Sequence, residues 1–267
     1  MDNKDDIKYL LHFTTVDSLM KILVTDEFRF SNVLYMNDIN ESIPIHKRYY
    51  NDSKRYMFNN ELVEDEIKLR SKTFLGCFNI FENEGDIRNK PSMWGHYGDR
   101  GEGVCLKINK DILDSIVENV NNDDDLMKPS YNGHIRKFRI NYKSNEEIEQ
   151  DNNIYIKSIE RKKYVAPMPD VYWAKRMFSI KSKDWEIENE FRYLFYFWDN
   201  EQKYFYLDDF KKCIDSIYIG DKHDRDSLKL LLKIKEKLAG DIRFYIRNGY
   251  LQEKIFDKEY YYTYING

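Results

Sequence analysis

The sequence has few of the residues that cross-link, interrupt or bend a chain. Its 267 residues include three cysteines, five prolines and eleven glycines, and no apolar run approaches the length of a membrane span. The cysteines are odd in number, isolated and set in apolar, strand-like runs, so we expect reduced core thiols. No Pro/Gly/Ser-rich linker divides the chain, which predicts one domain over residues 1–267.

A strong charge of one sign and a metal-binding spacing are also missing. The formal net charge of −4 argues against nonspecific coating of nucleic acid, although it leaves a local basic groove open. The five histidines show no HExxH or similar spacing, and no CxxC is present, so we predict no metal site. The polar start of the chain has no apolar stretch behind it. We therefore expect no secretory signal, no membrane association and a cytoplasmic location.

Aromatic residues are abundant in this sequence. The 22 tyrosines and 16 phenylalanines favour strands, and the apolar patterns predict an α+β fold with a mixed, mostly antiparallel sheet flanked by helices. We expect strands at residues 7–13, 28–30, 74–80, 104–108, 135–142, 191–198, 204–207, 214–219 and 242–246, and an edge strand at 260–264. Helices are expected after Thr14, over 41–72, 111–120 and 145–164, and from Asp224 to Gly240. A helical insertion is expected around 111–183.

A pair of carboxylates, Glu188 and Glu190, precedes an apolar strand. Because side chains alternate along a strand, we expect both to share one strand face with Arg192, roughly 7 Å apart for each two-residue step. In a partly buried site their repulsion would raise at least one pKa, which suits a carboxylate that handles a proton or a sugar hydroxyl. The alternative is a solvated strand end with Arg192 as counter-ion.

The segment from Tyr172 to Trp185, just before this pair, interleaves basic and aromatic residues. Its cations are Lys175, Arg176, Lys181 and Lys183. Such a segment would hold a pyrophosphate or a nucleic-acid backbone, or it forms a solvated helix face.

The order of several short motifs resembles a bacterial family of unknown function. The motifs are Leu10-Leu11-His12-Phe13-Thr14-Thr15, Tyr35-Met36-Asn37-Asp38, Met93-Trp94-Gly95-His96-Tyr97-Gly98, Gly101-x-Gly103-Val104 and Trp185-x-x-Glu188-x-Glu190-x-Arg192. That family in turn resembles the ADP-ribosyltransferases. The resemblance implies that Glu190 is the catalytic residue, that Glu188 orients the acceptor and that His12 binds a ribose hydroxyl.

The same resemblance implies that NAD is the substrate. Breaking its nicotinamide–ribose bond passes through an oxocarbenium-like state that a carboxylate stabilises. The implied NAD-binding residues are His12, Phe13, Thr14, Tyr35, Asn37, Trp94, Tyr97, Lys181 and Arg192. Among these, the aromatic rings of Tyr35, Trp94 and Tyr97 are expected to stack on the cationic nicotinamide. Each ring is equally suited to core or rim packing.

The resemblance therefore favours an NAD-dependent ADP-ribosyltransferase that modifies a protein or nucleic-acid acceptor. The systems in which such families generally occur imply a bacterial toxin or phage-defence role, with an antitoxin or immunity partner. Two alternatives stay open: a catalytically silent module that binds a nucleotide or nucleic acid, and a hydrolase that uses paired carboxylates.

Overall fold

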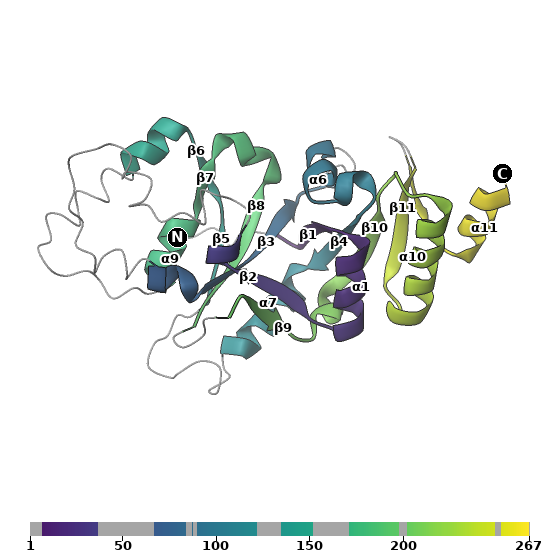
Figure 1. The fold of residues 1–267 in the computed structure, drawn as a ribbon, viewed down its shortest axis with the longest axis horizontal. Coiled ribbons are helices and arrows are strands. Elements are labelled where there is room, and N and C mark those ends of the chain that lie inside the picture. The colour runs from purple at the N-terminus through teal and green to yellow at the C-terminus, as the bar shows by residue number, and fades with distance from the viewer. Residues whose placement is uncertain are drawn as a thin grey trace, which may run out of the picture. The chain divides into compact units, whose positions relative to one another are not determined.

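The computed structural model describes residues 7–36, 67–83, 87, 90–121, 135–151, 171–197, 202–248 and 252–266. The chain forms two compact units, each assembled from segments that are separated in the sequence. The first unit comprises Met1–Phe28, Phe78–Glu118 and Leu207–Gly267, and the second comprises Arg29–Cys77 and Asn119–Tyr206. The strands and helices are labelled in Figure 1. Strand β3 (Thr73–Phe81) contributes residues to both units.

A mixed sheet forms the centre of the first unit. Its strands are β1 (Tyr9–Thr14), β4 (Val104–Asn109), β10 (Ile214–Ile219), β11 (Arg243–Asn248), β12 (Gln252–Ile255) and the last part of β3. The hydrogen-bonded order is β12-β11-β10-β4-β1-β3, and β10 with β11 is the parallel pair among otherwise antiparallel neighbours in the described part of this unit. A parallel pair needs a crossover, which helix α10 (Arg225–Leu238) supplies.

Capping residues set where the helices of the first unit begin. Helix α1 (Val16–Thr25) starts after Thr15, whose side chain accepts a hydrogen bond from the Ser18 amide, and ends at Asp26 in the left-handed conformation. Asp224 caps α10 in the same way. Each such cap contributes about 1 kcal/mol, because it satisfies an amide that the helix leaves unpaired. The other helical segments of this unit are α6 (Pro91–His96), η2 (Asp99–Gly101), α7 (Lys110–Asn121), η4 (Phe210–Cys213) and α11 (Lys258–Asn266).

Apolar side chains cover the sheet of the first unit. Helices α1 and α10 are neighbours in the packing, as Figure 1 shows. Helix α6 packs its Met93 and Trp94 into a cluster with strand residues, and Trp94 also donates from Nε1 to the carbonyl of Ile87 at 2.7 Å. The cluster contains Leu11, Phe13, Ile87, Met93, Trp94, Cys105 and Tyr218.

The second unit has its own set of mostly antiparallel strands. They are β2 (Phe28–Asn32), the first part of β3, β5 (Ile135–Arg139), β8 (Glu190–Tyr196) and β9 (Tyr204–Leu207). Strand β3 pairs with β2 and β8, β5 pairs with β8, and β9 lies beside β2. Two short strands, β6 (Asn141–Lys143) and β7 (Ile180–Ser182), form a separate parallel pair. The helical segments of this unit include η1 (Val33–Tyr35), α9 (Val171–Phe178) and η3 (Lys183–Glu188), and residues 67–71 and 145–151 are helical as well.

Strand β8 is buried on both faces. All of its residues are buried, and its Leu194 and Tyr196 belong to a cluster with Val33, Leu69, Leu75, Phe138, Ile140, Ala174 and Phe178. A charged residue on such a strand must find its partners inside the protein, because water does not reach it. Glu190 and Arg192 therefore depend on neighbouring protein groups for their polar contacts.

Most of the expected elements are present, and the α+β class with a mixed, mostly antiparallel sheet is confirmed. Strands β9 and β10 have the predicted bounds. The strand expected at 191–198 starts at Glu190 and ends at Tyr196, and the one expected at 135–142 divides into β5 and β6. Within 111–183 the described residues include strands β5, β6 and β7 as well as helices. Most of the helix expected at 41–72 lies outside the described residues.

The edge strand predicted at 260–264 is wrong, because these residues lie in helix α11. Asp257 accepts a hydrogen bond from the Tyr260 amide, which is a helix-start contact. Tyr260 then stacks on Tyr264 at 6.4 Å, while Tyr261 is buried. The i, i+4 spacing of the stacked rings is the helical one, so tertiary context overrides the β preference of tyrosine.

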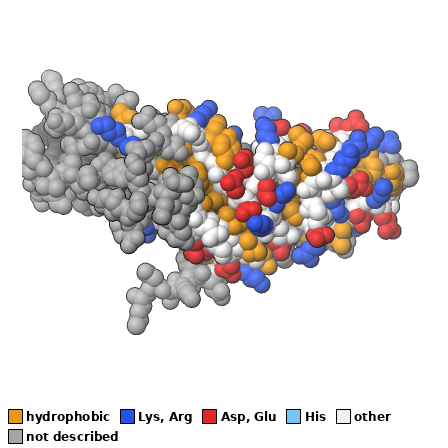
Figure 2. Space-filling view, turned by 90° about the horizontal axis from the view of Figure 1, so that it is seen from below, with side chains coloured by type: hydrophobic (Ala, Val, Ile, Leu, Met, Phe, Trp, Pro, Cys, Tyr) orange, Lys and Arg blue, Asp and Glu red, His pale blue; other side chains and the backbone are white. Residues whose placement is uncertain are grey.

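The surface carries both signs of charge. On the face shown in Figure 2, basic and acidic side chains of the described residues are interspersed with apolar ones. No helix in the described part of the chain combines the length and the apolar character that a membrane span requires.

Two glycines of the first unit give a matched test of the packing. A Cβ at Gly103 would lie 2.3 Å from the Thr14 carbonyl oxygen and 2.8 Å from that of Gly98, whereas one at Gly95 meets nothing within 4 Å. Backbone atoms cannot move aside, so Gly103→Ala should destabilise the protein by about 1–3 kcal/mol. Gly95→Ala, inside helix α6, should be neutral or stabilising by up to about 1 kcal/mol. Denaturant melts of both variants measure the difference, and equal midpoints would contradict this packing.

Candidate functional site

The two carboxylates of the Glu-x-Glu motif belong to different elements. Glu188 ends the 3-10 helix η3, Asn189 adopts the left-handed conformation (φ 44, ψ 58), and Glu190 opens strand β8. The prediction that one strand carries both residues is therefore wrong. Asparagine tolerates this backbone region better than most residues do. Although the two carboxylates lie on different elements, the turn at Asn189 places both of them near the ammonium of Lys181.

Glu190 and Arg192 form a bidentate pair, two residues apart on one face of β8. Arg192 donates from Nε to Oε1 of Glu190 at 2.7 Å and from Nη2 to Oε2 at 2.9 Å. Its Nη1 donates to the carbonyl of Phe178, the last residue of α9, at 3.0 Å. The predicted sharing of a face by these two residues is thus present, and it fixes the end of α9 against β8.

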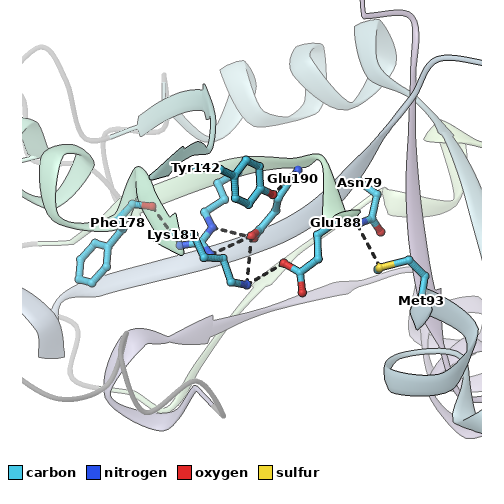
Figure 3. A network of polar contacts seen from close by, with 8 residues as sticks. Asn79, Met93, Tyr142, Phe178, Lys181, Glu188 and Glu190 are labelled. Carbon is cyan, nitrogen blue, oxygen red and sulfur yellow. Dashed lines mark hydrogen bonds and ion pairs between the residues drawn. The ribbon is translucent and has the colours of Figure 1, made fainter. Parts of the chain in front are cut away.

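Lys181 lies between the two carboxylates, as Figure 3 shows. Its Nζ is 2.7 Å from Oε2 of Glu188 and 3.5 Å from Oε2 of Glu190. The same ammonium lies 5.1 Å from the ring centroid of Trp185, within cation–π range. Strand β7 thus supplies the positive charge that joins η3 to β8.

Two further groups at this site carry no signal in the sequence. The hydroxyl of Tyr142 accepts a hydrogen bond from the Glu190 amide at 2.9 Å, and the thiol of Cys77 hydrogen-bonds the Glu190 carboxylate. Tyr142 stands beside Lys181 because β6 and β7 are paired in that register. Burial raises the pKa of Tyr142, so the phenol stays protonated. Both groups come from segments remote from the motif, which is why motif spacing could not reveal them.

The cluster is buried. Glu188, Glu190 and Arg192 are 3%, 4% and 0% exposed, so the alternative of a solvated strand end is excluded. Burial by itself would raise the pKa of Glu190, but the positive charges of Arg192 and Lys181 outweigh it and hold that pKa below its usual value. Glu190 is therefore not a carboxylate whose pKa is raised. Two carboxylates and two cations balance in charge, and Glu190 stays ionised.

Three further candidates, His12, Phe13 and Thr14, lie on strand β1 of the first unit. The ring of His12 is half-buried between Phe28 and Phe78, at centroid distances of 4.9 and 5.7 Å. Phe13 points to the opposite face and is buried, and Thr14 is nearly so. His12 is thus packed as a strand-end aromatic residue, and its role toward ribose stays a prediction.

The two aromatic candidates of α6 and its end differ in exposure. Trp94 is 3% exposed and meets Phe13 edge-on at 5.2 Å, so its ring is a core side chain. Tyr97 is 42% exposed. A ring that stacks on a ligand needs an accessible face, which Tyr97 has and Trp94 lacks in this structure.

The remaining candidates lie in the second unit or outside the described residues. Tyr35 is 53% exposed, with the ammonium of Lys203 5.3 Å from its ring centroid. Asn37 lies outside the described residues. In the basic segment, Lys175 and Lys183 are exposed, whereas Lys181 is directed to the carboxylates. The described residues contain no cluster of three or more histidine, cysteine or acidic side chains that would hold a metal ion.

A protein family described as "protein of unknown function (DUF2971)" matches residues 93–193. This segment includes the Trp94–Gly98 motif and the whole Trp185–Arg192 motif, so over it the chain is similar to a family of unknown function, as the motifs predict. No curated protein and no solved structure matches the chain.

The charge pairing of Glu190 predicts how stability depends on pH. A carboxyl group whose pKa is lowered by folding adds stability above its unfolded value, about 4.3, and loses that contribution as the pH falls through the folded value. The melting temperature of the wild type should therefore fall steeply on acidification below about pH 4.5. Glu190→Gln should melt lower at neutral pH and depend less on pH in this window.

Glu186→Gln is the matched control, because Glu186 is an exposed carboxylate of η3. Its acid profile should follow that of the wild type. Parallel acid profiles for Glu190→Gln and the wild type would show that the buried pair does not stabilise the fold.

Proposed function

We propose that the second unit carries a site for glycosidic-bond chemistry on NAD, of the kind that ADP-ribosyltransferases perform. The observation that carries the proposal is the position of the Lys181 ammonium between Glu188 and Glu190. The two carboxylates thus surround a place that accepts one positive charge. The nicotinamide ring of NAD is cationic, and positive charge moves onto the ribose as its bond breaks.

In this proposal Lys181 is an internal counter-ion that the substrate displaces. The Lys181 side chain is long and flexible, and 10% of it is exposed. When it moves away, the two carboxylates face the ligand with an excess negative charge. We therefore do not assign Lys181 to the pyrophosphate, because its charge is already compensated by Glu188.

The reaction itself requires little from the protein beyond charge and position. The bond between ribose C1′ and the nicotinamide nitrogen breaks, its electron pair leaves with neutral nicotinamide, and an acceptor oxygen bonds C1′ and releases a proton. Glu190 stays ionised through Arg192 and suits stabilisation of the oxocarbenium-like state. Glu188, on the other side of Lys181, is the residue to which we assign orientation of the acceptor.

A second candidate is a module that binds without catalysis. The specific observation in its favour is the balance of two carboxylates with two cations in a buried network, since structural ion-pair networks have the same composition. A toxin or defence role, with its antitoxin or immunity partner, belongs to either candidate and rests on the family resemblance.

The displaced-lysine mechanism predicts discrimination between NAD and NADH, because the reduced ring is neutral. NAD at 100 times its dissociation constant should stabilise the wild type by about 2.7 kcal/mol, and NADH at that same concentration should stabilise it less. In Lys181→Met the advantage of NAD over NADH should increase, because the carboxylates keep their charge without the ammonium. Thermal melts with each ligand, referred to each variant's own baseline, measure this difference.

Lys183→Met is the control, since Lys183 is exposed and lies two residues away. It should behave as the wild type does. Equal shifts with NAD and NADH in all three proteins would contradict the mechanism, and no shift with either ligand would favour the module without catalysis.

Release of nicotinamide from NAD tests the roles of the carboxylates. Glu190→Gln should lower kcat by about 10²–10³-fold, the typical effect of losing one preorganised electrostatic contact. Glu188→Gln should spare hydrolysis more than transfer of labelled ADP-ribose to macromolecules of a cell extract. Assays run well below the melting temperature of each variant, with Glu186→Gln as control. Equal losses of hydrolysis and transfer in both variants would rule out the division of roles.

A further inference from the structure

An exposed patch of tyrosines and cations lies at the β2–β9 edge of the second unit. Strand β2 alternates so that Arg29 points outward while Phe30 is buried. Strand β9 alternates in the same sense: Phe205 packs inward, and Tyr204 and Tyr206 point outward. We call the outer group, Arg29, Tyr35, Lys203, Tyr204 and Tyr206, the tyrosine–cation patch.

The cations of the patch are held by rings. The Arg29 guanidinium lies 4.4 Å from the Tyr204 ring centroid, and the Lys203 ammonium lies 5.3 Å from the centroids of Tyr204 and Tyr35. Exposed contacts of this kind contribute about 0.5–1 kcal/mol each. Within the described part of the chain, neither cation forms an ion pair with a carboxylate. A ring orders a cation without cancelling its charge, so the patch stays positive.

The rings of the patch offer accessible faces. Tyr35 and Tyr206 are 53% and 48% exposed. The Tyr206 and Tyr204 rings lie 6.3 Å apart, as their alternate positions on one strand require. Aromatic rings presented by a sheet are platforms on which unpaired bases stack, at about 1–3 kcal/mol per base.

We propose that the tyrosine–cation patch binds single-stranded nucleic acid. Bases stack on Tyr206 and Tyr35, and Arg29 and Lys203 contact the phosphates. An acidic peptide would use the two cations but not the exposed ring faces, so the combination favours a polymer with both phosphates and bases. A local patch also suits a chain whose net charge of −4 argues against nonspecific binding. This inference does not depend on the proposed reaction with NAD.

Fluorescence anisotropy of the full chain with a labelled, mixed-sequence single strand of about 12 nucleotides tests the proposal. The wild type should bind at low salt. Tyr35→Leu/Tyr206→Leu should weaken binding at least about 30-fold, the smallest loss expected for two stacked bases. Arg29→Gln/Lys203→Gln should flatten the slope of log affinity against log salt by about 1.4, since each contact with a single strand contributes about 0.7.

Matched controls come from the first unit. Tyr262→Leu/Tyr264→Leu removes two tyrosines of α11 that are each 53% exposed, and Lys229→Gln/Lys233→Gln removes two exposed cations of α10. Both should bind as the wild type does. The proposal is overturned if the wild type fails to bind, if the controls lose as much affinity as the patch variants, or if polyglutamate displaces the oligonucleotide as effectively as unlabelled single strand does.

Discussion

The bidentate contact between Arg192 and Glu190 is the interaction on which the polar centre of the second unit depends. Each of these charges loses several kcal/mol of hydration when it is buried, and only close, aligned hydrogen bonds recover that loss. The pair then organises its surroundings. Arg192 binds the end of α9, the Glu190 carboxylate draws in Lys181 of β7, and the Glu190 amide is bound by Tyr142 of β6. Removing Arg192 would leave the buried Glu190 with the more distant Lys181 ammonium, and removing Glu190 would take from Arg192 its bidentate carboxylate.

Stability alone does not explain why a buried strand carries charges. Buried ion pairs are often no more stable than apolar residues of the same volume, and strand β8 is apolar at its other positions. What the charges add is position: Arg192 fixes the Glu190 oxygens, and Lys181 donates a hydrogen bond to Glu188. The proposed exchange of an internal cation for one on a ligand requires this placement of both carboxylates around one ammonium.

Local patterns predicted much of the fold, and long-range register accounts for the rest. The bounds of β9 and β10 follow from their apolar runs, and the pairing of Glu190 with Arg192 follows from their spacing on one strand. The contact of Tyr142 with Glu190 joins residues 48 positions apart, and it depends on how β6 pairs with β7. The change from the 3-10 helix to the strand at Asn189 could not be predicted from the sequence either, because a single left-handed residue leaves no periodic signal.

The structure uses cation–π contacts in two environments with opposite consequences for charge. Lys181 meets the ring of Trp185, but two carboxylates lie within 3.5 Å of its ammonium, so its charge is compensated inside the unit. Arg29 and Lys203 meet tyrosine rings at the surface, where a ring holds a cation without neutralising it. The sequence between Tyr172 and Trp185 suggests a basic aromatic surface for phosphates. Of the described residues, those that combine exposed tyrosine rings with cations lie on β2, η1 and β9, where Arg29 meets Tyr204 although the two are far apart in the sequence.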